Sequence, residues 1–301
     1  MRLKTFYFGA WSAASLLVAA APIYAETVNC TAITAVPYTI TTPGVYCVTQ
    51  KITSNLASGA AITINANNVV LDLNGFAIGN IAAGPATGAA GIYAVDRQNI
   101  RLRNGIVRGF NFGVALLDGT SVGLTTANSS GHIVEGITAD HCYAVGIAVQ
   151  GPYSTVKFSS VYATTGSANS STAGGAASGI SVDNAPGGIV RNNQVFDTDC
   201  SNGCTVGTGI AAGIEIGSSP SSQVSGNTVT NSTLPTVANS VAIAVDMTTT
   251  NIFVQGNVLA NWNTGITFGS LSSGKYHGNG FIGGITTNVQ GTTGVNAGGN
   301  Y

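Results

Sequence analysis

The stretch Ser178–Val195, SGISVDNAPGGIVRNNQV, contains two short alternations of apolar and polar residues separated by a turn. Ile180 and Val182 mark the first alternation, and Val190 and Val195 mark the second. The same phrase returns in other parts of the chain: GIYAVDRQNIRLRNGIV (91–107), GIAVQGPYSTVKFSSVYA (146–163), GIEIGSSPSSQVSGNTV (213–229), AIAVDMTTTNIFVQGNVL (242–259) and GITFGSLSSGKYHGNGF (265–281). Such recurrence is typical of repeat proteins, whose units bury their apolar faces by stacking on one another.

The spacing of these phrases predicts strands. The small residue that opens each phrase stands at positions 91, 113, 146, 179, 213, 242 and 265, so the steps vary from 22 to 34 residues. This variation is unlike a rigid helical repeat and fits coils of short strands whose turns accept insertions. Each phrase has two segments with a period of two, which predicts at least two strands per coil. The chain is therefore predicted to be an all-β solenoid.

The first 25 residues predict a secretory signal peptide. Arg2 and Lys4 precede a short apolar run that ends in the small-residue sequence IYA. A membrane anchor is the alternative, but the run is short and contains two serines, which favours the signal peptide. No later segment is long and apolar enough to cross a bilayer. We therefore expect a secreted protein, extracellular or periplasmic, with no membrane span in the mature chain.

The composition excludes some classes of protein. Only 7% of the 301 residues are charged, and without Arg2 and Lys4 eight basic residues face eleven acidic ones. No basic patch indicates a nucleic-acid partner. The hydrophobic fraction of 44% is too high for a disordered chain.

Five cysteines are consistent with export. Cys30 and Cys47 form one close pair and Cys200 and Cys204 a second, and both are predicted to be disulfides. Cys142 is predicted to be a buried free thiol. The spacing typical of cysteine-rich zinc sites is absent, so no metal site of that kind is expected.

The chain divides into four predicted segments. Residues 1–25 are the signal peptide, and 26–60 form an N-terminal cap whose strand-like pattern is broken by prolines. Residues 61–283 form the parallel β-helix, with about eight coils that begin near residues 62, 92, 114, 147, 180, 214, 243 and 266. Residues 284–301 are a C-terminal tail rich in Gly, Thr and Asn.

Alignment of the second strands predicts which residues are neighbours along the solenoid. One column of residues follows an inward apolar position and points outward by a period of two: Asp72, Arg103, Glu135, Ser159, Arg191, Ser225, Gln255 and His277. Two residues further on in each coil, the last four coils carry Asn193, Asn227, Asn257 and Asn279. Stacked asparagines can hydrogen-bond to one another along the axis, so these residues are predicted to form a structural ladder without a catalytic role.

This pattern resembles the right-handed parallel β-helix family, the pectate-lyase-like superfamily. The resemblance covers Ile62–Ile282 and is carried by LDLNGF (71–76), by RLRNGIVRGF (101–110) and by the recurring GI-x-V and GN-x-V phrases. It implies a right-handed parallel β-helix. The family contains polysaccharide lyases, hydrolases, epimerases and surface adhesins, so the fold leaves the activity open.

One candidate site is a charged column on the first three coils. Asp72, Arg103 and Glu135 are predicted neighbours, and Arg108 is predicted to lie beside Asp140. A lyase that acts on an acidic, uronic-acid glycan needs a base and a positive charge for the enolate, and some β-helix lyases also use calcium. Calcium is therefore the one cofactor that this alternative implies. An ion-pair ladder without catalytic function is the simpler interpretation.

A second candidate site is an acidic trio, Asp183, Glu215 and Asp246, on three later coils. Asp183 and Asp246 share a column two coils apart, about 10 Å between backbones, near the separation used by inverting glycosidases. The resemblance argues against this role, because the Asn-Thr-Asp, Asp-Asp, Gly-His-Gly and Arg-Ile-Lys motifs of polygalacturonase-type members are absent. Solvated surface acids are the alternative interpretation.

The tripeptide Asp140-His141-Cys142 and the nearby His132 are weak candidates for a metal site. Three consecutive strand residues alternate between faces, so they cannot all bind one metal ion. His141 could serve as an acid or base beside Asp140, but a surface histidine is the simpler interpretation.

Four tyrosines are candidates for stacking against sugar rings, although each could equally cover apolar surface: Tyr93, Tyr143, Tyr153 and Tyr162. Taken together, the sequence predicts a protein whose lateral face binds polysaccharide or another cell-surface polymer without strong catalysis. The alternatives are the lyase, which would use Arg103 or Arg108, and an inverting hydrolase that would use Asp183 and Asp246. No cofactor is expected apart from the calcium of the lyase alternative.

Overall fold

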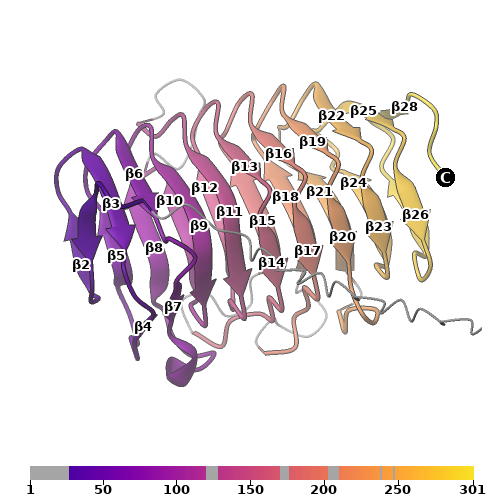
Figure 1. Ribbon diagram of the computed structural model, residues 1–301. Coiled ribbons are helices and arrows are strands. Elements are labelled where there is room, and N and C mark those ends of the chain that lie inside the picture. Colours follow the sequence, from indigo (N-terminus) through magenta and orange to yellow (C-terminus); the bar gives the residue numbers. More distant parts are fainter. Residues whose placement is uncertain (1–26, 120–127, 170–175, 203–209, 238, 247) are drawn as a thin grey trace, which may run out of the picture.

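A computed structural model describes residues 27–119, 128–169, 176–202, 210–237, 239–246 and 248–301. The predicted signal peptide and Cys204 lie outside these residues. The described chain winds into stacked coils that follow one another along a single axis (Figure 1). All strand pairs within these residues are parallel, so the predicted parallel β-helix is confirmed.

The first wall of the solenoid is a ten-stranded parallel sheet with one strand from each coil. Its strands are β2 (Tyr38–Ile40), β5 (Ala60–Ile64), β8 (Ala90–Val95), β10 (Phe112–Leu117), β12 (Val145–Gln150), β15 (Ala176–Asp183), β18 (Ile210–Gly217), β21 (Asn239–Asp246), β24 (Thr264–Phe268) and β27 (Thr287–Gln290). Eight of them, from β5 to β24, coincide with the predicted coil starts. β2 and β27 extend the sheet by one coil at each end, within the segments predicted as cap and tail.

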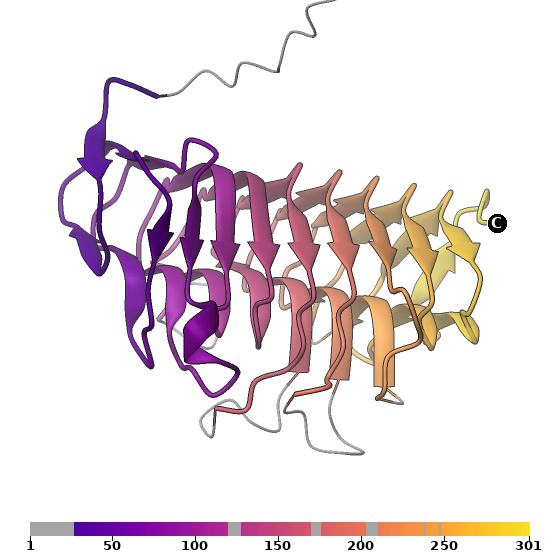
Figure 2. The same cartoon turned by 60° about the horizontal axis from the view of Figure 1, so that its bottom comes forward.

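The second wall is an 18-stranded sheet that bends into two rows. The first row contains β1 (Thr31–Ile33), β3 (Gly44–Val48), β6 (Val69–Asp72), β9 (Arg101–Arg108), β11 (Ile133–Asp140), β13 (Thr155–Lys157), β16 (Ile189–Arg191), β19 (Gln223–Ser225), β22 (Ile252–Gln255), β25 (Gly274–His277) and β28 (Gly294–Asn296). The second contains β4 (Ile52–Thr53), β7 (Ala77–Gly79), β14 (Ser160–Tyr162), β17 (Gln194–Phe196), β20 (Thr228–Thr230), β23 (Val258–Ala260) and β26 (Gly280–Ile282). β9 and β11 are long enough to belong to both rows. A short 3₁₀ helix, η1 (Ile81–Ala83), follows β7 on the side where the second row returns to the ten-stranded sheet (Figure 2).

The bend between the two rows contains the predicted asparagine ladder. Asn193 Nδ2 donates to Asn227 Oδ1 at 3.0 Å, Asn227 to Asn257 at 2.9 Å and Asn257 to Asn279 at 2.9 Å. All four side chains are buried, whereas a strict period of two would place them outward. The residue before each ladder position has a positive φ, which turns the next side chain into the core: Asn192, Gly226, Gly256 and Gly278. The ladder is therefore confirmed, and its side chains lie in the core.

The same bend corrects one position of the outward column. Lys157 pairs with Glu135 on one side and with Arg191 on the other, so it occupies the place predicted for Ser159. Ser159 instead stands in the ladder, where its backbone N–H donates to Asn193 Oδ1 at 2.9 Å. The charged column is therefore Asp72, Arg103, Glu135, Lys157 and Arg191.

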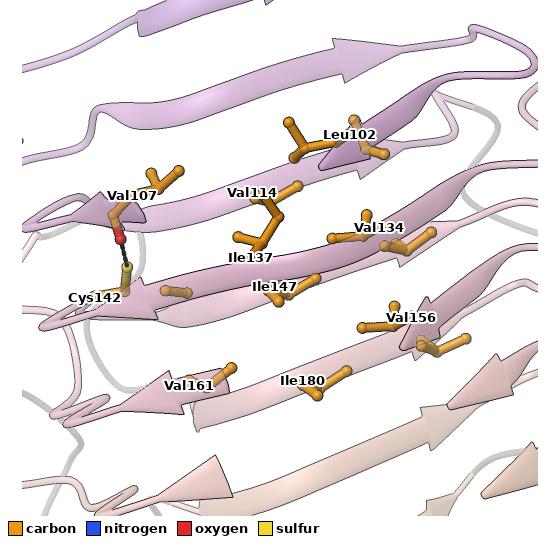
Figure 3. Close-up of a cluster of buried hydrophobic side chains, with 14 of the residues drawn as sticks. Leu102, Val107, Val114, Val134, Ile137, Cys142, Ile147, Val156, Val161 and Ile180 are labelled. Carbon is orange, nitrogen blue, oxygen red and sulfur yellow. Dashed lines mark hydrogen bonds between the residues drawn. The ribbon is translucent and has the colours of Figure 1, made fainter. Parts of the chain in front are cut away.

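The core consists of apolar side chains that stack from coil to coil (Figure 3). Leu102, Val134 and Val156 form one such stack, because their strands pair in register and all three are fully buried. Burial of each such side chain stabilises the fold by about 1.5–3 kcal/mol. Cys142 lies at the edge of this core as the predicted buried free thiol, and burial raises its pKa to about 12.

Cys30 and Cys47 form the predicted disulfide. Cys200 is also disulfide-bonded, but its pairing with Cys204 stays a prediction because Cys204 is not described. In the described part of the chain, no helix is long and apolar enough to cross a membrane.

Candidate functional site

Three carboxylates gather on the outer face of the ten-stranded sheet. Gly217 pairs with Asp183 on one side and with Asp246 on the other, so the two aspartates share a column as predicted. Glu215 lies on the strand between them, two residues earlier, opposite Ser181 and Ala244. All three acids are half-buried. We call this region, with its neighbours on β21 and β24, the acidic surface.

The acids of this surface resist ionisation. Burial, with added repulsion from Asp183 and Asp246, raises the pKa of Glu215 to about 7, although a hydrogen bond from Ser178 opposes the shift. Burial also raises the pKa of Asp183, and repulsion from Asp246 adds to it. Burial raises the pKa of Asp246. At neutral pH the carboxyl group of Glu215 is therefore protonated in some molecules and ionised in others.

Small hydroxyl groups position two of the acids. Ser178 Oγ donates to Glu215 Oε2 at 2.8 Å, and Ser181 Oγ donates to Asp183 Oδ2 at 3.0 Å. No Arg or Lys forms an ion pair with any of the three among the described residues. The carboxyl groups of Glu215 and Asp183 are thus held in place by uncharged hydroxyl groups, which do not neutralise the charge of an ionised carboxylate.

A groove of about 550 Å³ opens beside Asp246. Its lining includes hydroxyl and amide side chains from β21, β24, β27 and the turns next to them: Asn239, Ser240, Asn263, Thr264, Thr267, Thr286, Thr287 and Gln290. Ala244, the strand neighbour of Glu215, forms part of the same wall. Hydroxyl and amide groups both donate and accept hydrogen bonds, as sugar hydroxyls require.

The groove belongs to a longer strip of small side chains. Ala115, Ala148 and Ser181 follow one another in register on β10, β12 and β15, and Ala244 and Thr267 continue the column beyond Glu215. Tyr93, the neighbour of Ala115, lies further along this column toward the N-terminal coils, beside a second groove of about 430 Å³. Tyr93 is therefore the one predicted stacking tyrosine that shares a face with the acidic trio.

The other three tyrosines lie elsewhere. Tyr143 is buried, and Tyr153 is 76% exposed on the turn that leads into β13. Tyr162 lies on β14, where its ring stacks on Phe196 at 5.3 Å between centroids.

The charged column lies on the opposite wall, and its acids are paired. Asp72 is 2% exposed and accepts hydrogen bonds from Arg103 Nε at 2.8 Å and from Thr27 Oγ1 at 2.6 Å. Asn104 Nδ2 and the backbone N–H of Asn74 also donate to its carboxylate. Asp72 is therefore fully hydrogen-bonded, which fits a structural anchor better than a group that must exchange a proton.

Glu135 does not pair with Arg103, its strand neighbour. It forms ion pairs with Arg101 at 2.6 Å and with Lys157 at 3.0 Å. Burial raises the pKa of Glu135, but hydrogen bonds and charge from Lys157 and Arg101 outweigh this and leave the pKa below its usual value. The sequence did not identify Arg101, because its side chain crosses to the next coil from a position two residues before Arg103.

Arg108 and Asp140 are neighbours, as predicted, and form an ion pair at 2.9 Å. Asp140 also contacts His141. His132 is fully buried, and burial lowers its pKa to about 4. Its Nδ1 accepts from the backbone N–H of Ile100, so Nε2 donates to Ser129 Oγ at 2.7 Å. A neutral, doubly hydrogen-bonded histidine is structural, and the described residues contain no cluster of three metal-ligating side chains.

Comparison with known proteins identifies the fold but no family. No family model matches the chain, and no curated protein matches it either. Among solved structures, the chain is similar to the enzymatically active domain of tailspike protein 2 of bacteriophage CBA120, with 16% identity, a TM-score of 0.54, and coverage of 86% of this chain and 42% of that one. The full-length tailspike protein 2 of an Escherichia coli O157:H7 bacteriophage gives a TM-score of 0.52 at 16% identity, with coverage of 86% and 37%.

A DFA-IIIase from Arthrobacter chlorophenolicus A6 gives a TM-score of 0.49 at 13% identity, with coverage of 78% of this chain and 55% of that one. The chain spans less than two thirds of the length of each of these proteins. At this level of identity the likeness shows the fold alone.

Proposed function

We propose that the outer face of the ten-stranded sheet binds an extended polysaccharide. The observation that carries the proposal is the groove beside Asp246, because its hydroxyl and amide side chains can hydrogen-bond to the hydroxyl groups of a sugar chain. The acidic surface and its groove of hydroxyl and amide groups supply hydrogen bonds at one end, and Tyr93 supplies an aromatic ring at the other. In ligand sites of this kind, a small number of placed polar groups fixes the orientation of the ligand.

A blocked groove tests this proposal. Thr267→Arg places a long side chain on the floor of the groove, so the retardation of the protein in gels that contain a bound neutral glycan should fall to the level of a glycan-free gel. Ser225→Arg adds the same side chain to the outer face of the other wall, on β19, and should leave retardation unchanged. The proposal is overturned if no neutral glycan of a broad panel retards the protein, or if both variants are retarded by neutral glycans like the unmodified chain.

A second candidate function, hydrolysis of the bound polymer, is favoured by the pKa of Glu215. A carboxyl group with a pKa of about 7 can donate a proton to a glycosidic oxygen near neutral pH. Asp246, on the next strand and offset by two residues, lies about 8 Å away by strand geometry, within the range of inverting enzymes. Its carboxylate would take a proton from water as that water attacks the anomeric carbon, while the bond to the protonated oxygen breaks.

The hydrolase candidate predicts a specific pair of losses. Glu215→Gln and Asp246→Asn should each reduce the release of reducing ends by about 100-fold or more, because each removes a proton-transfer group. Asp197→Asn, an exposed acid after β17, is the matched control and should keep full activity. Activity should also fall above pH 7, where Glu215 loses its proton. If the polymer binds but no reducing ends appear, the protein is a binder and this candidate fails.

The lyase alternative is less well supported by the geometry. Arg103 is paired with the buried Asp72, and Arg108 with Asp140, so both guanidinium groups already have a carboxylate partner within the protein. Formation of an unsaturated, ultraviolet-absorbing product from uronic-acid polymers, with or without calcium, would restore this alternative. The Cys30–Cys47 disulfide supports the predicted export to an oxidising compartment.

A further inference from the structure

In one coil, bulky aromatic residues stand at two positions with a positive φ. At the same positions the other coils have mostly Gly or Asn. Phe158 has φ 52° at the bend of the 18-stranded sheet, in the column whose other members are Asn104, Gly136, Asn192, Gly226, Gly256 and Gly278. An aromatic side chain with this backbone conformation is a true outlier, since only Gly, and less often Asn or Asp, adopts it readily. The fold thus loses stability at a position where an asparagine would cost less.

The turn that precedes Phe158 in the same coil also has an aromatic residue with a positive φ. Tyr153 has φ 59°, two residues before β13, where the corresponding residues of other coils include Asn99, Gly131, Gly187, Ser221 and Asn251. Tyr153 is 76% exposed and Phe158 57% exposed, so neither ring is placed there to fill the core. Strained residues that stay exposed point to a role outside folding. We call Tyr153, Phe158 and Tyr162, all on the β12–β14 coil, the aromatic coil.

A groove of about 600 Å³ lies beside Phe158. Six of the residues that line it are Arg103, Asn104, Glu135, Gly136, Thr138 and Phe158. The ammonium group of Lys157 lies 5.7 Å from the centre of the Phe158 ring and holds the ring by a cation–π contact. Asn104 and Thr138 add groups that can donate and accept hydrogen bonds.

The surroundings of this groove carry a positive charge. The cations Arg101, Arg103, Lys157 and Arg191 stand on neighbouring coils with only two acids, Asp72 and Glu135, among them. The protein as a whole has a formal net charge of −1, so this excess of two positive charges is local. It contrasts with the acidic surface, which has no ion-paired cation among the described residues.

We infer that the aromatic coil and the adjacent groove form a second saccharide-binding site, which takes a sugar unit with a negatively charged substituent. The apolar face of the sugar ring stacks on Phe158, while its charged substituent lies near the cations of the charged column. Tyr153, about 16 Å away along the coil by strand geometry, offers a second ring to a longer chain. This site lies on the opposite wall from the polysaccharide surface proposed above and can exist whether or not that surface binds.

The test uses Phe158→Asn, which restores the residue type typical of the column. Removal of the backbone strain should raise Tm, by about 2 °C or more, while binding of an acidic polymer should fall at least tenfold. The binding measurement is affinity electrophoresis with polygalacturonate, alginate and dextran sulfate, and with dextran as the neutral partner of the last. Gly256→Asn, in the same column but three coils further on, has open space around its added side chain and is the matched control.

A second variant tests the same groove in case Phe158→Asn does not fold normally. Gly136→Asn adds a side chain to the groove wall at a φ that asparagine tolerates, and it should also weaken binding of the acidic polymers. Retention of binding by Thr267→Arg would separate this site from the first surface. The inference is overturned if no acidic polymer binds, if dextran binds as tightly as dextran sulfate, or if Phe158→Asn and Gly136→Asn both bind like the unmodified protein.

Discussion

The carboxylates on the two walls of this solenoid differ in whether a cation is paired with them. On the 18-stranded sheet, Asp72, Glu135 and Asp140 each have an arginine or lysine partner. On the ten-stranded sheet, Glu215 and Asp183 accept hydrogen bonds from serine hydroxyl groups, Asp246 has no Arg or Lys partner among the described residues, and burial raises the pKa of all three. Both walls consist of parallel strands in register, so the difference between them comes from their side chains. One wall has a ladder of ion pairs, and the other has carboxyl groups with a raised pKa, which we call the titratable surface.

The largest effect is expected at Asp72. Asp72→Ala removes the acceptor for Arg103, Thr27, Asn104 and the backbone of Asn74, so it should lower the free energy of unfolding by about 3 kcal/mol. Denaturant unfolding measures this change. Asp140→Ala breaks a more exposed pair and should cost no more than about 1 kcal/mol. Equal losses in the two variants would show that Asp72 is an ordinary surface acid.

The titration of Glu215 should give an effect of similar size. Because its folded-state pKa of about 7 lies above the unfolded value of 4.5, the folded state binds more protons between these values. Stability should therefore fall as pH rises from about 4.5 to above 7, by about 3 kcal/mol in all. In Glu215→Gln this part of the pH dependence should disappear. A pH profile that Glu215→Gln leaves unchanged would contradict the account.

The smallest effect is expected at Lys157. Its ion pair with Glu135 lies at the surface, and Arg101 remains as a second partner, so Lys157→Ala should change the free energy of unfolding by about 0.5 kcal/mol. A loss above about 2 kcal/mol would mean that the ladder on this wall acts as a cooperative unit.

Much of this architecture could be predicted from the sequence. The recurring GI-x-V and GN-x-V phrases predicted the coils, and the alignment of second strands predicted the ladder of Asn193 to Asn279. The shared column of Asp183 and Asp246 and the Arg108–Asp140 pair follow from the same register. These features depend only on which residues stand one above another, and repeats determine that directly.

Other features depend on backbone turns and side-chain reach, which the pattern does not encode. Phe158 replaces the Asn or Gly that marks the bend in other coils, so the alignment slipped by two residues there and Lys157 was missed. The pairing of Glu135 with Arg101 instead of Arg103 depends on side-chain conformations. The raised pKa of Glu215 comes from burial by neighbouring coils, which a list of surface positions does not reveal.

The contrast between the two walls is tested most directly by an NMR titration of the Glu215 side-chain carboxyl carbon, assigned by its loss in Glu215→Gln. The account predicts a midpoint near pH 7. A midpoint near pH 4.5 would show that this wall holds ordinary solvated acids, and the titratable surface would then not exist.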